Sequence, residues 1–300
     1  GDVNGDGLPD IIVGAGLGDS AHVFLNSPEG LEPEPVQSWQ VPGAWFGFSV
    51  SSAGDVNGDG YGDVIVGSML GFSAFLYYGG PEGPGSGPDT SLSTGAFGFG
   101  VSVSSAGDVN GDGYEDIICG AANGIPPEAS VWLGGPDGPE ATASQIFTGD
   151  GTFGISTRGA GDLNGDGYAD IVVGNPDPGS QSIVAHYGGP DGLSAEPSFF
   201  ATGPTNFGLS VAGAGDLNGD GYGDVVVSAK DAAFVYHGSS AGLIDPPALT
   251  LEGPPGSQFG DSVAALGDTN GDGFDDLGVG APSAASAFVY FGSASGLTDA

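Results

Sequence analysis

The sequence predicts an all-β fold made of repeated four-stranded antiparallel blades, and three observations carry that prediction. An acidic nonapeptide occurs six times, beginning at residues 2, 55, 108, 162, 216 and 268. Short apolar runs rich in Val, Ile, Phe and Tyr, which are typical of strands, stand at the same places in every repeat. The 62 glycines and 22 prolines are spread between these runs, where they indicate frequent turns.

Each repeat contains four strand-like segments in a fixed order. A segment that opens on FG, such as FGFSVSSAG (46–54), precedes the nonapeptide, and a run such as DVIVG (63–67) follows it. A third run such as SAFLYYG (73–79) and a closing run such as SQIFTG (144–149) complete the unit. Four short strands repeated radially make a β-propeller, in which neighbouring blades protect most strand edges. A stack of β-solenoid turns is the alternative, although it usually has a shorter period and parallel strands.

The repeats predict that residues 1–300 form a single propeller domain. The repeats begin near residues 1, 46, 99, 153, 207 and 259. The first lacks its FG strand and the last stops before its fourth strand, so we expect three strands in each of these and four in every repeat between them. The ring is then six-bladed, or seven-bladed if more chain exists at the ends.

The charge balance excludes some classes of partner. The chain has 38 acidic and 2 basic residues and a formal charge of -36. Such a chain is repelled by nucleic acid phosphates and by anionic membrane surfaces. No apolar stretch approaches the about 20 residues that span a bilayer. We therefore expect no nucleic acid partner and no direct membrane insertion.

The nonapeptide D-x-N-G-D-G-x-x-D is typical of a calcium loop. It presents side-chain oxygens at positions 1, 3, 5 and 9, position 7 can add its backbone carbonyl, and the glycine at position 6 permits a sharp turn. Ca²⁺ takes about 6–8 oxygen ligands in flexible geometry, whereas Mg²⁺ demands a stricter octahedron and Zn²⁺ prefers His or Cys. The alternative is a set of metal-free turns in which Asp and Asn side chains bind the backbone. Repetition of the same pattern six times favours calcium.

About six calcium sites are thus predicted, one in each nonapeptide. The predicted ligands are Asp2, Asn4, Asp6, Leu8 and Asp10; Asp55, Asn57, Asp59, Tyr61 and Asp63; Asp108, Asn110, Asp112, Tyr114 and Asp116; Asp162, Asn164, Asp166, Tyr168 and Asp170; Asp216, Asn218, Asp220, Tyr222 and Asp224; and Asp268, Asn270, Asp272, Phe274 and Asp276. Leu8, the four tyrosines and Phe274 would each contribute a carbonyl oxygen.

These motifs resemble FG-GAP repeats, which form the calcium-bearing propeller at the N-terminus of integrin α subunits and also occur in bacterial proteins. The resemblance rests on FG at the start of a strand, the D-x-N-G-D-G-x-x-D loop and the apolar run after it. A full GAP stands only at Gly280-Ala281-Pro282. The loops also resemble the first half of an EF-hand loop, but they lack Glu at position 12 and lie between strands. The resemblance implies a calcium-binding propeller and no cofactor other than calcium.

The loops on the opposite edge of the blades are where we expect a partner to bind. Antiparallel order places the 2–3 turns and the 4–1 connections together, away from the nonapeptides. These segments do not repeat in sequence, and variable loops often carry function. They are residues 41–47, 69–73, 121–129, 175–181 and 228–233. Trp45 could serve binding or packing, whereas Phe46 and the three histidines His22, His186 and His237 are expected to serve structure. Lys230 is expected to form a local ion pair with the neighbouring Asp231.

The pattern as a whole favours a non-catalytic, calcium-braced module for protein interaction or adhesion. A lectin-like carbohydrate-binding propeller is the alternative. A polysaccharide-active enzyme is less favoured, because two basic residues and three scattered histidines offer no clear set of acid, base and nucleophile. Calcium loops fill most readily at millimolar calcium, so we expect an extracellular or cell-surface location.

We predict that a calcium chelator lowers the melting temperature strongly. Three aspartates in each of six loops account for 18 of the 38 acidic residues, and without a cation they repel one another. A ligand that binds only the folded state adds about 2.7 kcal/mol per site when its free concentration is 100 times Kd. Thermal unfolding with and without chelator measures the effect, and an unchanged curve would contradict the calcium prediction.

Overall fold

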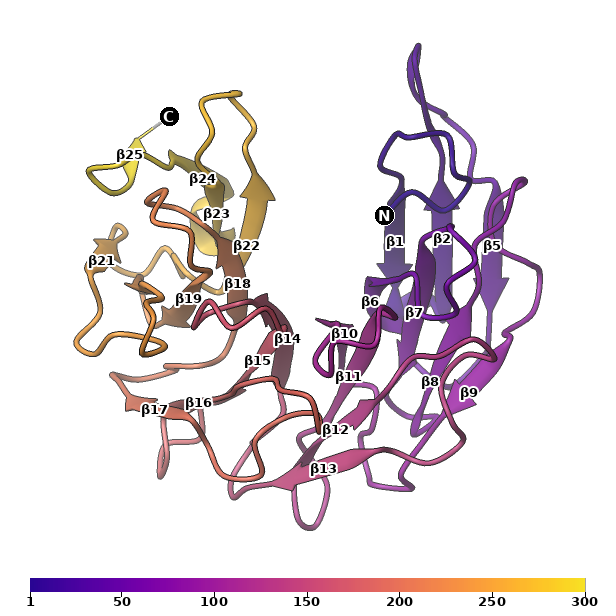
Figure 1. Cartoon of the computed structure of the whole chain (residues 1–300), viewed down its shortest axis with the longest axis horizontal. Coiled ribbons are helices and arrows are strands. Elements are labelled where there is room, and N and C mark those ends of the chain that lie inside the picture. The colour runs from indigo at the N-terminus through magenta and orange to yellow at the C-terminus, as the bar shows by residue number, and fades with distance from the viewer. Residues whose placement is uncertain (300) are drawn as a thin grey trace. The chain divides into compact units, whose positions relative to one another are not determined.

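The fold is all-β. A computed structural model describes residues 1–299, and it consists of strands, turns and two short 3-10 turns, η1 (Gly16–Gly18) and η2 (Pro282–Ala284) (Figure 1). Within residues 1–299, no helix has the length and apolar character to cross a bilayer. The predicted fold class is therefore confirmed.

Antiparallel sheets in chain order follow one another along the sequence, as the blades of a propeller do. The first blade has three strands, β1 (Ile11–Ala15), β2 (Ser20–Phe24) and β5 (Gln37–Gln40), and a small hairpin of β3 (Asn26–Ser27) and β4 (Gly30–Leu31) projects beside it. The strand pairs are antiparallel, so the β-solenoid alternative is wrong.

The second to fifth blades have four strands each, as predicted. They are β6 (Phe46–Gly54), β7 (Asp63–Ser68), β8 (Ser73–Tyr77) and β9 (Thr90–Leu92); β10 (Ser102–Gly107), β11 (Asp116–Ala121), β12 (Glu128–Trp132) and β13 (Gln145–Thr148); β14 (Ser156–Gly161), β15 (Asp170–Asn175), β16 (Ser182–His186) and β17 (Phe199–Thr202); and β18 (Val211–Gly215), β19 (Asp224–Ala229), β20 (Ala232–Tyr236) and β21 (Leu249–Glu252).

The sixth blade corrects the expectation of only three strands in the last repeat. It contains β22 (Ser262–Gly267), β23 (Asp276–Ala281), β24 (Ser286–Phe291) and a short fourth strand, β25 (Thr298–Asp299). The turn after β24 brings the chain back at once, so that Thr298 pairs with Phe291. This strand is too short to show an apolar pattern in the sequence.

A β-bulge leads into each nonapeptide that follows an FG strand. In the second blade the register shifts between Ser52 and Gly54, and Gly54 pairs with Asp63 across the loop. Gly54 has φ 76°, a conformation that glycine adopts without the steric cost of a side chain. The same shift precedes the nonapeptide in the third to sixth blades. The bulge thus ends the strand at the residue before the first aspartate.

The described chain divides into two compact units of three blades each. The first contains Gly1–Asp108 with Asp112–Gly149, and the second contains Val109–Gly111 with the chain from Asp150 onward. The assignment of one continuous propeller domain stays a prediction.

The FG pair fills the space between neighbouring blades. Phe46 is fully buried and packs against Phe75, with ring centroids 5.7 Å apart. Gly47 has φ 79°, and a side chain there would collide with the carbonyl oxygen of Ser20 in the preceding blade. In the second unit Phe207 is buried in the same way, and its ring meets that of Tyr236 edge to face. The phenylalanine therefore supplies apolar volume and the glycine permits close approach.

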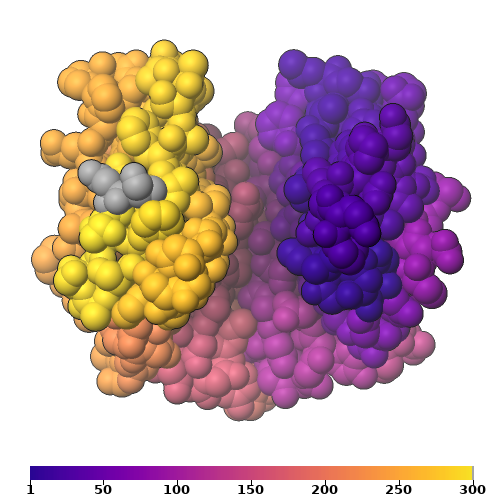
Figure 2. All heavy atoms as spheres, turned by 90° about the horizontal axis from the view of Figure 1, so that it is seen from above, coloured from indigo at the N-terminus to yellow at the C-terminus, as the bar shows by residue number. Residues whose placement is uncertain are grey.

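The sixth blade lies at one surface of the second unit, with no other segment of that unit in front of it (Figure 2). Leu266 in its first strand is exposed, whereas Ala214, at the same position of the fifth blade, is fully buried. Likewise Thr269 is exposed although Leu217, at the same loop position one blade earlier, is buried. The described residues of the unit thus leave this blade face bare.

We predict that the FG phenylalanines carry much of the folding free energy. Replacing Phe207, which is 1% exposed, by Ala should destabilise the protein by about 3–5 kcal/mol, because a large cavity is left in the core. Phe200→Ala is the matched control at a residue 60% exposed, and should change stability by less than about 0.5 kcal/mol. Denaturant unfolding measures both, and equal losses would refute this assignment.

Candidate functional site

Each nonapeptide forms the turn between the first and second strands of its blade, where the sequence placed it. In the second blade, residues 55–62 connect β6 to β7 and Asp63 begins β7. The first aspartate closes the loop: one oxygen of Asp55 accepts the amides of Gly58 and Asp59 at 2.7 and 3.1 Å, and the other accepts Gly60 N–H at 2.9 Å. The same three bonds form at Asp2, Asp162, Asp216 and Asp268.

Positions 3 and 5 lie side by side in the same turn. Asn57 Oδ1 accepts Asp59 N–H at 3.0 Å, and its amide nitrogen donates to Asp59 Oδ2 at 2.9 Å. The other oxygen of Asp59 accepts Tyr61 N–H at 3.1 Å. Carboxylate and amide oxygens of positions 1, 3 and 5 are therefore brought together by the backbone itself.

The ninth aspartate has a role that the sequence did not predict. Asp63 is fully buried, with Oδ2 accepting Val56 N–H and Oδ1 accepting Gly79 N–H, both at 2.9 Å. It thus ties the start of the loop to the end of the third strand. Equivalent pairs of bonds form at Asp10, Asp170, Asp224 and Asp276. The bonds do not use every lone pair, since a carboxylate offers about four acceptor sites.

Burial and neighbouring charge act on these carboxyls together. Burial raises the pKa of Asp63 to about 7, the bonds from Gly79 and Val56 lower it, and the charges of Asp59 and Asp55 raise it again. Burial likewise raises the pKa of Asp170 to about 7. Asp55, Asp59 and Asp63 are thus close enough for their charges to repel, and an ionised set is favoured only with a cation.

The residues present fit calcium. All four side chains are hard oxygen donors, which suit Ca²⁺, and the only basic side chains, Arg158 and Lys230, belong to the second unit. No lysine or arginine in the first unit can therefore neutralise its loops. A Ca²⁺ ion would supply that positive charge, held by the side chains of positions 1, 3 and 5. The individual ligand assignments stay predictions.

The third nonapeptide divides between the two units, with Asp108 and residues 112–116 in the first. Asp108 accepts the amides of Asp112 and Gly113 at 3.1 and 2.9 Å. Asp116 accepts Gly134 N–H at 2.8 Å, as the other ninth aspartates do. These bonds follow the pattern of the second loop.

Successive loops interlock. The ring at position 7 covers the glycine at position 4 of the preceding loop, so a Cβ at Gly58 would lie 2.6 Å from Tyr114 Cε1. The amide at position 8 donates to the position 1 carbonyl of the preceding loop, as in Glu115 N–H to Asp55 O at 3.2 Å. Further pairs of this kind are Tyr61 with Gly5, Tyr168 with Gly111, Tyr222 with Gly165 and Phe274 with Gly219. The recurrence of Tyr at position 7 was the sequence signal for this contact.

Comparison with known proteins agrees with this geometry. The FG-GAP-like repeat family matches residues 2–66, 55–119, 108–173 and 162–227, overlapping spans that together cover more than half of the chain. The chain belongs to the FG-GAP-like repeat family.

Integrin α subunits are among the relatives of this FG-GAP chain. Integrin alpha-5 of Xenopus laevis is 38% identical over 165 residues, which is 47% of this chain and 16% of the integrin. Integrin alpha-7 of Rattus norvegicus is 35% identical over 182 residues, covering 54% of this chain and 16% of the integrin. The chain thus spans about a sixth of the length of these relatives.

Solved structures support the fold of this FG-GAP chain. A protein of unknown function from Desulfotomaculum acetoxidans superposes with a TM-score of 0.65 at 11% identity, covering 98% of this chain and 79% of that one. BBS1N, solved in complex with ARL6DN, has a TM-score of 0.58 at 13% identity and covers 92% and 72%. At these identities the likeness concerns the fold alone.

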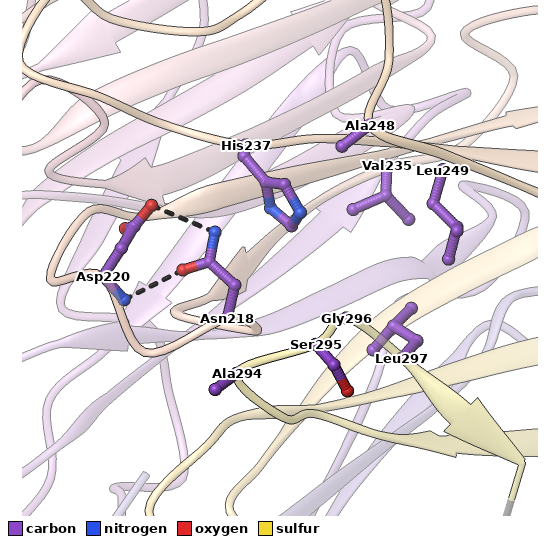
Figure 3. A pocket seen from close by; sticks show the side chains of 10 residues that line it. All are labelled: Asn218, Asp220, Val235, His237, Ala248, Leu249, Ala294, Ser295, Gly296 and Leu297. Carbon is purple, nitrogen blue, oxygen red and sulfur yellow. Dashed lines mark hydrogen bonds between the residues drawn. The ribbon is translucent and has the colours of Figure 1, made fainter.

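The three histidines of the FG-GAP repeats contact different partners. His22 lies between Ser38 and Ser20, at 2.9 and 3.1 Å. His186 is buried, which lowers its pKa, and its Nδ1 lies 2.7 Å from the Ser194 carbonyl. His237 Nδ1 lies 3.1 Å from Asp224 Oδ1. The first two are packed as predicted, whereas His237 also lines a pocket beside the fifth loop, which Figure 3 shows.

The loops opposite the nonapeptides are held by aspartates of the 2–3 turns. Asp19 accepts Gly43 N–H and Trp45 N–H at 2.6 and 2.7 Å. Asp231 accepts Gly256 N–H and Gln258 N–H in the same way, both at 3.0 Å. The carboxylate of Asp231 therefore serves the backbone, and no ion pair with Lys230 forms among the described residues, contrary to the prediction.

We predict an inverted pH dependence of stability for the metal-free protein. Burial raises the pKa of Asp63 and Asp170 in the folded state, so both carboxyls bind a proton more tightly there. Their contribution to the free energy of unfolding is therefore complete below pH 3.8 and is lost as the pH rises to about 7. In chelator, the melting temperature should fall across this window. In excess calcium the trend should reverse, because the ion favours the ionised form.

Substitution isolates the groups responsible. Asp63→Asn should flatten the pH trend measured by thermal unfolding in chelator. Asp137→Asn, at an exposed aspartate outside the nonapeptides, removes the same charge and should leave the trend in place. If both variants behave alike, general charge repulsion and not the buried carboxyl is responsible.

Proposed function

We propose that this chain is a non-catalytic, calcium-stabilised protein-interaction module that works outside the cell. Its contact surface lies on the first unit, on loops opposite the nonapeptides. We call this the loop surface, formed by Leu17, Trp45, Phe48, Leu70, Phe72, Phe97 and Ile125. Membership of the FG-GAP family and the integrin relatives support the proposal, as does a donor set suited to the millimolar calcium outside cells.

The observation that carries the proposal is the exposure of large apolar side chains on these loops. Leu17 is 92% exposed, Phe97 55% and Ile125 100%. Exposed apolar groups gathered on one side of a soluble domain mark interaction sites more often than isolated ones do. At the positions of Trp45 and Phe97, the fourth-to-fifth blade connection of the second unit has Asn206 and Thr205. The apolar character therefore belongs to the first unit and is not required by the repeat.

Trp45 is held in a conformation that packing alone does not favour. Its φ is 49°, in the left-handed region that costs a bulky residue free energy. The two bonds to Asp19 hold the segment there, and the indole stacks on Phe48 with ring centroids 5.7 Å apart and an interplanar angle of 13°. Phe72 and Phe97 form a second ring pair at 4.9 Å. Rings fixed in advance lose little entropy when a partner binds.

The test is binding to a panel of purified extracellular proteins in calcium. Trp45→Asn and Phe97→Thr introduce the residues of the second unit, and Asn206 already tolerates a positive φ of 65°. Each should weaken binding to a partner by about 30-fold, the scale of a contact worth 2 kcal/mol. Phe200→Ala, on β17 outside the loop surface, is the control and should bind normally.

Two results would contradict the proposal. One is a wild-type chain that binds no protein of the panel. The other is equal binding by wild type and both loop variants, with circular dichroism showing that all are folded. Binding to a glycan array in place of proteins would support the carbohydrate-binding alternative.

A further inference from the structure

One position lies near the end of the third strand-like segment in each repeat, and where Tyr occupies it the side chain reaches the next blade of the same unit. It precedes the residue whose amide binds the ninth aspartate, such as Gly79, Gly188 and Gly238, which bind Asp63, Asp170 and Asp224. We call it the bridging position. It is occupied by Leu25, Tyr78, Leu133, Tyr187, His237 and Phe291 in chain order.

Tyrosine at the bridging position reaches the next blade. The hydroxyl of Tyr187 accepts Leu243 N–H at 2.8 Å, and its ring packs on the buried cluster that contains Leu243. Gly242 has φ 91°, and a side chain there would collide with the Tyr187 hydroxyl. In the first unit, a side chain at Gly138 would collide with the Tyr78 hydroxyl in the same way. The turn of the following blade is thus built to receive a phenol.

His237 leaves the corresponding place open. The imidazole is shorter than a phenol, and its Nδ1 lies 3.1 Å from Asp224 Oδ1. A pocket of about 410 Å³ remains between the fifth blade and the turn at 294–297 of the sixth (Figure 3). That turn corresponds to residues 240–243, which receive Tyr187 one blade earlier.

We propose that this pocket binds the phenol ring of a tyrosine side chain supplied by a partner protein. The hydroxyl accepts a hydrogen bond from Leu297 N–H, as Tyr187 does from Leu243. The ring lies against Val235, Leu249 and Leu297, which line the pocket with His237. This site is distinct from the loop surface, and it does not depend on the proposed role of that surface.

The lining explains why a neutral phenol is favoured. Asp220 lines the pocket and Asp224 lies behind His237, so an anionic ligand meets two carboxyl groups. The apolar side chains form one wall and would leave the hydroxyls of a carbohydrate without partners on that side. A phenol presents a flat apolar ring and a single polar atom, which matches both parts of the lining.

The experiment measures binding of N-acetyl-L-tyrosinamide to the full chain in calcium, by ligand-observed NMR saturation transfer. We expect a signal with this probe and a weaker one with N-acetyl-L-phenylalaninamide, which lacks the hydroxyl. His237→Tyr should fill the pocket from within and reduce the signal at least about tenfold. His22→Tyr introduces the same residue at a histidine that does not line the pocket, and should leave the signal unchanged.

A second measurement needs no variant. Titration of the wild-type chain with the probe should shift the imidazole resonances of His237 and leave those of His22 in place, which keeps the test decisive if His237→Tyr fails to fold. Absence of binding by wild type, an unchanged signal in folded His237→Tyr, or a preference for methyl α-D-glucopyranoside over the tyrosine probe would each overturn the proposal.

Discussion

The buried carboxylate at the ninth position of the nonapeptide is the interaction on which the site depends. In the second blade Asp63 accepts one amide from its own loop and one from the end of the third strand. It therefore fixes the loop against the blade before any metal is considered. Hydrogen bonds to a charged acceptor contribute about 1.5–3 kcal/mol each. Removing this carboxylate would deprive the amides of Val56 and Gly79 of both bonds. The glycine that binds this carboxylate directly follows the bridging position. The carboxylate therefore also fixes the backbone from which the bridging side chain extends toward the next blade.

Within each unit, the interlock joins successive loops to one another. A ring from one loop covers a glycine of the loop before it, and a backbone bond joins the two at 2.7 Å between Gly62 N and Asp2 O. A larger residue in place of the position 4 glycine in any of the first five loops would displace the aromatic ring that covers it. In the last loop, no atom of residues 1–299 lies within 4 Å of a Cβ at Gly271, so the described residues provide no covering ring there.

The sequence predicted the blades well because their determinants are local and repeated. Six copies of one pattern revealed the strands, the position of each loop and the role of Phe46, since apolar period and turn residues act over a few positions. It did not reveal that Asp63 would turn both oxygens to backbone amides, because that geometry depends on Gly79, which is distant in the chain. Nor could it show that Asp231 would accept two backbone amides and not pair with Lys230. The pocket beside His237 was equally hidden from it. Those features depend on contacts across strands and blades.

The pocket at His237 shares two residues with the fifth nonapeptide, so calcium binding to that loop would affect the pocket. Asn218 and Asp220 line the pocket and are also predicted ligands, with Asn218 Nδ2 donating to Asp220 Oδ2 at 3.0 Å. A cation in the loop would draw the oxygens of both side chains toward itself and away from the pocket. The wall that a phenol meets would then become less negative. Ligand and calcium should consequently favour one another, and linkage requires the effect to be equal in both directions.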